Sequence, residues 1–109
     1  MILIVDDNSQ IAQFLSLVLG GAGFQVALAG SVGEALSKLE SDGPFRLLLS
    51  DLGLPDGSGL DLSQQAREKQ PELKVLLMSG YDVDAPGLNF ILKPFDPTVL
   101  VDKVRALLE

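Results

Sequence analysis

Short, mostly apolar runs alternate with amphipathic segments along the chain. Such runs are typical of strands buried on both faces of a sheet, and five occur: Ile2–Val5, Phe24–Ala29, Phe45–Ser50, Leu73–Met78 and Leu88–Leu92. Between most of these runs, apolar residues recur at helical spacing. The alternation therefore predicts the α/β class, with one parallel sheet covered by helices on both faces.

The first two predicted helices carry clear signals at their ends. The apolar face of the first is formed by Ile11, Phe14, Leu15, Val18 and Leu19. Its end is predicted from three glycines, Gly20, Gly21 and Gly23. Ser31 and Glu34 have the spacing of a capping box, which predicts where the second helix begins.

Two further helices are predicted in the second half of the chain. One follows a Gly- and Pro-rich loop at residues 53–59 and ends near Lys69. Asp96 and Pro97 predict the N-cap and first residue of a closing helix. The apolar face of that helix is formed by Leu100, Val101, Val104, Leu107 and Leu108.

Composition narrows the class of protein. The 109 residues fit one domain, predicted to span 1–109, and 47% hydrophobic with 21% charged residues is a globular composition. No apolar run suits a membrane span or a secretory signal, so we expect no membrane contact and a cytoplasmic location. Eight basic and fifteen acidic residues give a net charge of −7, which argues against nucleic acid as a partner. The chain has no Cys and no His, which excludes disulfides, thiolate nucleophiles and imidazole bases.

Chemically useful side chains follow four of the five predicted strands. Asp6 and Asp7 follow the first, Asp51 the third, Ser79 the fourth and Lys93 the fifth. Parallel strands that alternate with helices have their carboxyl ends at one edge of the sheet, where ligands bind. We therefore expect these side chains to form one site.

The three carboxylates of this edge need positive charge nearby. Unit charges ~4 Å apart repel by ~4 kcal/mol at an effective dielectric constant of ~20. A hard cation with oxygen ligands relieves this repulsion, and Mg²⁺ usually takes one or two carboxylates while keeping several waters. Lys93 supplies a second cation, and both would stabilise a phosphoryl group carried by a carboxylate. The sequence thus predicts Mg²⁺-assisted phosphoryl transfer to an aspartate.

Five motifs in this order resemble the response-regulator receiver domain of two-component signalling. They are Ile4–Asp7, Leu49–Pro55, Asp56–Gly57, Met78–Gly80 and Leu92–Phe95. The resemblance covers the whole chain. It implies a flavodoxin-like, doubly wound, five-stranded parallel sheet with strand order 2-1-3-4-5.

The resemblance also implies roles for individual residues. Asp51 looks like the phosphoacceptor, and Lys93 would contact the phosphoryl group. Asp7 would bind Mg²⁺ directly, Asp6 directly or through water, and Gly53 through its backbone carbonyl. Asp51 would complete the metal ligands.

Three further expectations concern switching and local geometry. Ser79 would hydrogen-bond a phosphoryl oxygen and draw its loop inward. Phe90 stands where the family keeps an aromatic switch, often Tyr, although an aromatic residue in a buried strand is commonly part of the core. By resemblance, the Lys93–Pro94 peptide bond would be cis.

The chain departs from the family between the fourth and fifth strands. Only residues 80–87 separate Ser79 from Leu88, whereas a crossover that contains a helix needs at least ~10–12 residues. The helix that the family has between these two strands, its fourth, is therefore predicted to be missing or reduced to a turn. An apolar patch left uncovered there would favour a homodimer through the face made by the fourth and fifth strands and the closing helix.

Three functions compete. The first is a phosphoacceptor receiver, free-standing or part of a hybrid histidine kinase, which takes its phosphoryl group from a histidine kinase or a histidine phosphotransfer domain. Such a receiver catalyses only its own phosphorylation and dephosphorylation. The second is a receiver-like interaction module that signals without phosphorylation. The third, an unrelated α/β protein, is disfavoured, because a haloacid-dehalogenase-type phosphatase needs an acid at Gly53, and Asp6 and Asp7 would repel a flavin phosphate.

Overall fold

The computed structural model describes residues 1–80, 88–93 and 96–109. The main strands are β1 (Ile2–Val5), β2 (Val26–Ala29), β3 (Leu47–Asp51), β6 (Lys74–Ser79) and β7 (Asn89–Leu92). Two short strands, β4 (Gly53–Leu54) and β5 (Gly57–Ser58), form a hairpin after β3. The helices are α1 (Ser9–Gly21), α2 (Val32–Ser41), α3 (Gly59–Lys69) and α4 (Pro97–Leu108).

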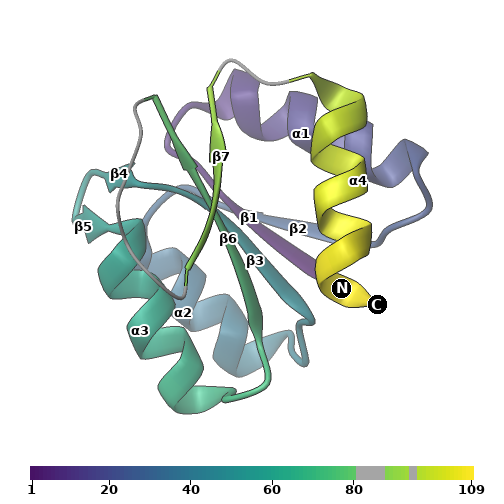
Figure 1. Ribbon diagram of the computed structural model, residues 1–109. Coiled ribbons are helices and arrows are strands. Elements are labelled where there is room, and N and C mark those ends of the chain that lie inside the picture. The colour runs from purple at the N-terminus through teal and green to yellow at the C-terminus, as the bar shows by residue number, and fades with distance from the viewer. Residues whose placement is uncertain (81–87, 94–95) are drawn as a thin grey trace.

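The five main strands form one parallel sheet in the order β2-β1-β3-β6-β7. This is the order that the family resemblance implies, and the predicted strand boundaries differ from the observed ones by at most two residues. The fold class is therefore confirmed. Helices α1 and α4 lie on one side of the sheet, and α2 and α3 lie on the other (Figure 1).

Each face of the sheet has its own hydrophobic core. Alternate residues of a strand point to opposite faces, so Leu3 and Val5 pack with α2 and α3, whereas Ile2 and Ile4 pack with α1 and α4. All four residues of β1 are buried, which explains why the central strands are apolar without interruption. No helix within the described ranges is long and apolar enough to cross a membrane.

Most of the predicted helix signals are confirmed, with one exception in α1. Ser31 accepts a hydrogen bond from the backbone N–H of Glu34, and Asp96 accepts one from Thr98, as expected for N-caps. Phe14, however, is 49% exposed, because the buried stripe of α1 runs through Ala12, Leu15 and Leu19 and leaves Phe14 at its margin.

The glycines at the end of α1 act differently from one another. Gly20 and Gly21 are the last two residues of α1, so the prediction that the glycines end this helix is confirmed. Gly23 follows the C-cap residue Ala22 and has a φ of 97°, a left-handed conformation that glycine adopts without steric cost. This residue lets the chain turn from α1 toward β2.

Residues 81–87 and 94–95 lie outside the described residues, and three expectations fall on them. The described parts contain four helices, and none of these lies between β6 and β7. The predicted loss of the crossover helix, the homodimer through the neighbouring face and the cis Lys93–Pro94 bond all remain predictions. The described part of that face exposes two apolar side chains, Leu92 and Val99, each by 46%.

Candidate functional site

The candidate site lies where the direction of strand addition reverses. The chain runs from β1 outward to β2 and then returns to β3 on the other side of β1. Val5 and Ser50 are paired in register, so Asp6 and Asp51 come next on two neighbouring strands. In open α/β sheets this reversal leaves a crevice at the carboxyl ends of the strands, which is where ligands bind.

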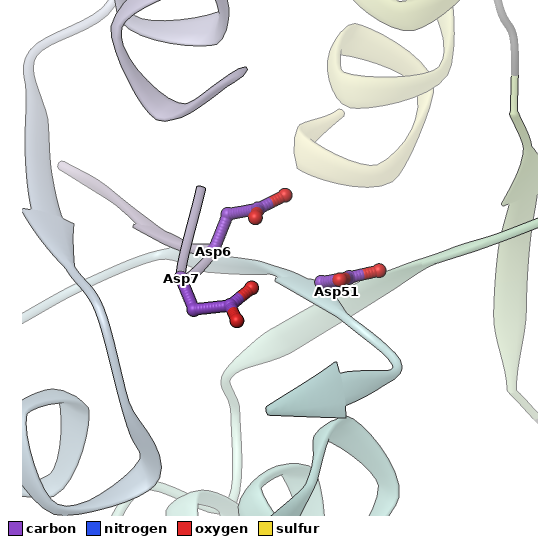
Figure 2. A group of neighbouring side chains, drawn as sticks. All are labelled: Asp6, Asp7 and Asp51. Atoms are coloured by element: carbon purple, nitrogen blue, oxygen red, sulfur yellow. The ribbon is translucent and has the colours of Figure 1, made fainter. Parts of the chain in front are cut away.

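Three carboxylates meet at this point, as the sequence predicts. Carboxylate oxygens of Asp6, Asp7 and Asp51 all lie within 4.8 Å of one another. Asp6 is buried, Asp51 is partly buried and Asp7 is exposed. Figure 2 shows that the carboxylates of Asp6 and Asp7 both extend toward the side on which Asp51 lies. Exposure to solvent therefore increases across the cluster from Asp6 through Asp51 to Asp7.

Lys93 brings a positive charge to the cluster from the end of β7. Its Nζ lies 3.0 Å from Asp51 Oδ1 and 3.7 Å from Asp6 Oδ2. Strand β6 stands between β3 and β7, so the long lysine side chain reaches across one strand to make these contacts. The predicted proximity of Lys93 to the carboxylates is thus confirmed.

Asp6 makes fewer hydrogen bonds than a buried carboxylate needs. Its Oδ1 accepts a hydrogen bond of 2.9 Å from the backbone N–H of Asn8. Its Oδ2 is buried, and none of the described residues donates a hydrogen bond to it. Burial raises the pKa of Asp6, and this outweighs the hydrogen bond from Asn8 and the charge of Lys93, which lower the pKa.

The donor set fits a hard divalent cation. A metal ion near Asp6 Oδ2 would satisfy the buried oxygen, and one or two carboxylates of this cluster together with water molecules suit Mg²⁺. The geometry therefore supports a metal site made by the residues that the sequence singles out.

Replacing Asp6 by Asn is expected to stabilise the metal-free protein. With EDTA present at pH 7, Asp6→Asn should raise the free energy of unfolding by about 1 kcal/mol, because it removes an incompletely satisfied buried charge. The folded-state pKa is raised, so ionisation of Asp6 costs stability as the pH rises from 3.8 through the folded pKa. Urea denaturation should show that Asp6→Asn is more stable than the wild type at pH 7, and that this difference disappears as the pH falls toward 3.8. A less stable variant at pH 7 would contradict this view of Asp6.

The Asp51 carboxylate is held in place by its surroundings. Its Oδ1 accepts hydrogen bonds of 3.0 Å from both Lys93 Nζ and the backbone N–H of Leu52. The Leu52 N–H also lies 3.0 Å from the carbonyl oxygen of Met78 on β6. A Cβ added to Gly59 would lie 2.4 Å from the Asp51 carbonyl oxygen, so only glycine allows the chain to pass so close. The position of Asp51 is therefore fixed by backbone contacts.

The remaining predicted residues lie around the same edge of the sheet. Ser79 is buried at the end of β6, and its carbonyl oxygen accepts a hydrogen bond of 2.7 Å from the N–H of Lys93. Gly53 begins β4, two residues after Asp51, and is exposed. Phe90 is partly buried in β7 and packs against the core on the α2–α3 side of the sheet. The roles predicted for these three residues remain predictions.

Two contributions near the site were not predicted. Asn8 is the N-cap of α1, and its side chain accepts hydrogen bonds from the backbone N–H groups of Gln10 and Ile11. The sequence carried this signal, since Asn after a strand and before an apolar helical face favours an N-cap. Asp56 lies in the predicted Gly- and Pro-rich loop at residues 53–59, and its carboxylate binds the N-terminus of α2. Its partners are more than twenty residues away, so no local pattern indicates that contact.

A doubly wound parallel sheet with carboxylates and a lysine at its switch point defines the receiver class of α/β domains. The chain belongs to the response regulator receiver domain family, whose sequence profile matches residues 2–105. It is thus a receiver domain of two-component signalling, as its motifs predict.

Three known proteins show the likeness in detail. The response regulator receiver protein CpdR of Brucella abortus is 31% identical, over 98% of this chain and 95% of CpdR. The CAI-1 autoinducer sensor kinase/phosphatase CqsS of Vibrio cholerae is 34% identical, over 96% of this chain and only 17% of CqsS. The crystal structure of the receiver domain from the hybrid histidine kinase CckA matches with a TM-score of 0.89 at 31% identity, covering 99% of this chain and 98% of the other. The chain thus resembles a protein of about its own length and a small part of a sensor kinase.

Proposed function

We propose that this receiver accepts a phosphoryl group on Asp51 from a phosphohistidine of a histidine kinase or a histidine phosphotransfer domain. One observation carries the proposal. Asp51 Oδ1 lies 3.0 Å from Lys93 Nζ, and the Asp51 carboxylate lies within 4.8 Å of those of Asp6 and Asp7. A carboxylate nucleophile, a fixed cation and a cation-binding acid pair are the components of aspartyl phosphate chemistry. The chain has no His, so the donor histidine belongs to a partner or to another domain.

The transfer exchanges one bond to phosphorus for another. The ionised Asp51 carboxylate attacks the phosphorus in line with the bond to the donor imidazole. An O–P bond forms while the N–P bond breaks, and the electron pair of that bond stays on the imidazole nitrogen, which takes a proton from solvent. Lys93 stabilises negative charge on the transferring group, because its ammonium lies beside the attacking oxygen.

Asp6, Asp7, Asp51 and the Gly53 carbonyl would hold Mg²⁺. When bound, Mg²⁺ supplies a Lewis acid that neutralises charge on phosphoryl oxygens. Asp6 and Asp7 lie beside Asp51, so their negative charge would attract the cation to the oxygen that attacks phosphorus. The receiver thereby assists its own phosphorylation and, when water later attacks the acyl phosphate, its own dephosphorylation.

Ser79 and Phe90 would transmit the effect of phosphorylation from Asp51 to the surface of the domain. Ser79 lies at the end of β6, next to β3 and β7, so its hydroxyl can move toward a phosphoryl oxygen on Asp51. Such a contact shifts an equilibrium between two conformations that exist before phosphorylation. Phe90 has no hydroxyl, so any signal through this residue must travel by the packing of its ring. We also place this reaction in the cytoplasm.

Replacing Lys93 by Gln is expected to slow phosphorylation by about a hundredfold, as for loss of one preorganised electrostatic donor. The glutamine amide can still donate a hydrogen bond to Asp51 but carries no charge. A time course of labelling by acetyl phosphate at saturating Mg²⁺ would measure the loss. Lys103→Gln is the matched control, because Lys103 is an exposed lysine whose Nζ contacts the Phe90 carbonyl oxygen rather than a carboxylate. Equal rates for the two variants would remove Lys93 from the proposed role.

Phosphotransfer from a protein donor tests the function itself. The purified chain is mixed with histidine kinases or phosphotransfer domains that carry phosphohistidine, and both partners are followed on phosphate-affinity gels. The expected result is rapid movement of the label to this chain with one donor. Binding of a donor without any transfer, together with no labelling by acetyl phosphate, would instead support the interaction module that signals without phosphorylation.

A further inference from the structure

Asp56 joins the hairpin after Asp51 to the start of α2. Its Oδ1 accepts a hydrogen bond of 2.8 Å from the Val32 N–H, and its Oδ2 accepts one of 3.0 Å from the Gly33 N–H. These are two of the backbone donors that the first turn of any helix leaves without an intrahelical acceptor. The N-cap Ser31 accepts from a third donor, the Glu34 N–H. Two side chains from separate segments therefore bind the N-terminus of α2.

The hairpin and the helix also touch closely. A Cβ added to Gly57 would lie 3.2 Å from Val32 Cγ2, and one added to Gly33 would lie 3.5 Å from Asp56 Oδ2. The two backbone hydrogen bonds lower the pKa of Asp56, so the carboxylate remains ionised at neutral pH. Contact and charge thus fix the tip of the hairpin to α2.

The same hairpin carries Gly53. Strands β4 and β5 pair Gly53 with Ser58 and Leu54 with Gly57, which leaves Pro55 and Asp56 at the turn. At the base of the hairpin, the Gly59 N–H donates a hydrogen bond of 2.8 Å to the Leu52 carbonyl oxygen. Gly53 therefore lies between two anchors, one next to Asp51 and one at Asp56.

We propose that Asp56 is a positioning residue of the metal site. By holding the hairpin tip on α2, Asp56 fixes the exposed two-residue strand whose first residue is Gly53, and so keeps the Gly53 carbonyl available to the cation. This rests on the proposed function, which assigns that carbonyl to Mg²⁺. Asp56 acts from outside the cluster of carboxylates and touches neither the metal nor the phosphoryl group.

The experiment compares two ways of weakening the same helix end. Asp56→Ala removes the link to the hairpin, whereas Ser31→Ala removes a cap of α2 and leaves the hairpin contacts intact. Amide NMR titrations with MgCl₂ on the whole chain give the dissociation constant, and thermal melts in EDTA give the Tm. We expect Asp56→Ala to weaken Mg²⁺ binding by about tenfold, as loss of an outer-shell partner does. Ser31→Ala should lower the Tm to a similar extent while changing Mg²⁺ affinity less than about twofold.

Further variants separate geometry from charge and from folding. Asp102→Asn removes one exposed carboxylate from α4 and should leave Mg²⁺ affinity unchanged. Asp56→Asn keeps one acceptor oxygen, so its Mg²⁺ affinity should fall between those of the wild type and Asp56→Ala. This variant keeps the test decisive if the alanine variant does not fold. Equal affinities for Asp56→Ala and Ser31→Ala would make Asp56 a helix cap only and overturn the proposal. A wild-type chain that binds no Mg²⁺ would overturn the metal site of the proposed function as well.

Discussion

Replacing Asp51 by Asn is expected to reduce phosphorylation of this receiver to background. The carboxylate oxygen proposed to attack phosphorus becomes part of a neutral amide, which is a much weaker nucleophile. The change is otherwise small, because asparagine has nearly the same shape and its oxygen can still accept hydrogen bonds from Leu52 N–H and Lys93 Nζ. Acetyl phosphate with Mg²⁺ is the donor, and the mass of the intact protein reports the phosphoryl group.

Asp102→Asn gives the matched control for this experiment. Asp102 is an exposed carboxylate on α4, so its loss should leave labelling unchanged. If Asp51→Asn still became labelled at a comparable rate, the acceptor would be another carboxylate of the cluster, Asp6 or Asp7. The same donor applied to Asp6→Asn and Asp7→Asn would then identify it.

The fold could be predicted because its signals are local. A strand buried on both faces has to be apolar at every position, and Ile2–Val5 meets that condition without exception. Caps such as Ser31 and Asp96 act on N–H groups two or three residues away, so their sequence spacing is enough to find them. Phe14 was misplaced because helical spacing defines a stripe but not how the helix rotates on the sheet.

The site could be predicted for a different reason. Asp6, Asp7, Asp51 and Lys93 were found because each follows a strand, and a parallel sheet brings those positions to one edge. The contact of Asp56 with Val32 and Gly33 depends on where a hairpin meets a helix in three dimensions. The unsatisfied Oδ2 of Asp6 likewise becomes visible only once burial is known. Sequence position thus predicts which residues gather, whereas the structure shows how well each is paired.

Withdrawal of Mg²⁺ should abolish labelling of Asp51 while leaving the protein folded. Without the cation, Lys93 must balance three carboxylates that lie within 4.8 Å of one another. Loss of Lewis-acid charge stabilisation costs several kcal/mol in the transition state, so labelling by acetyl phosphate in EDTA should fall by about a thousandfold or more. Circular dichroism in EDTA should be unchanged, because the two hydrophobic cores lie away from the cluster.

Thermal stability provides an independent measure of Mg²⁺ binding. Binding to the folded chain alone stabilises it by RT ln(1 + [Mg²⁺]/Kd), which is about 2.7 kcal/mol at one hundred times the Kd. The Tm of the wild type should therefore rise with MgCl₂ concentration, and Asp7→Asn should lose most of this rise together with its labelling. Lys93→Gln separates Mg²⁺ binding from phosphorylation, because this variant should keep the Mg²⁺-dependent rise in Tm while its rate of labelling falls. Labelling that persists in EDTA, or a Tm that does not respond to Mg²⁺, would show that the acid cluster works without a metal and that Lys93 alone balances its charge.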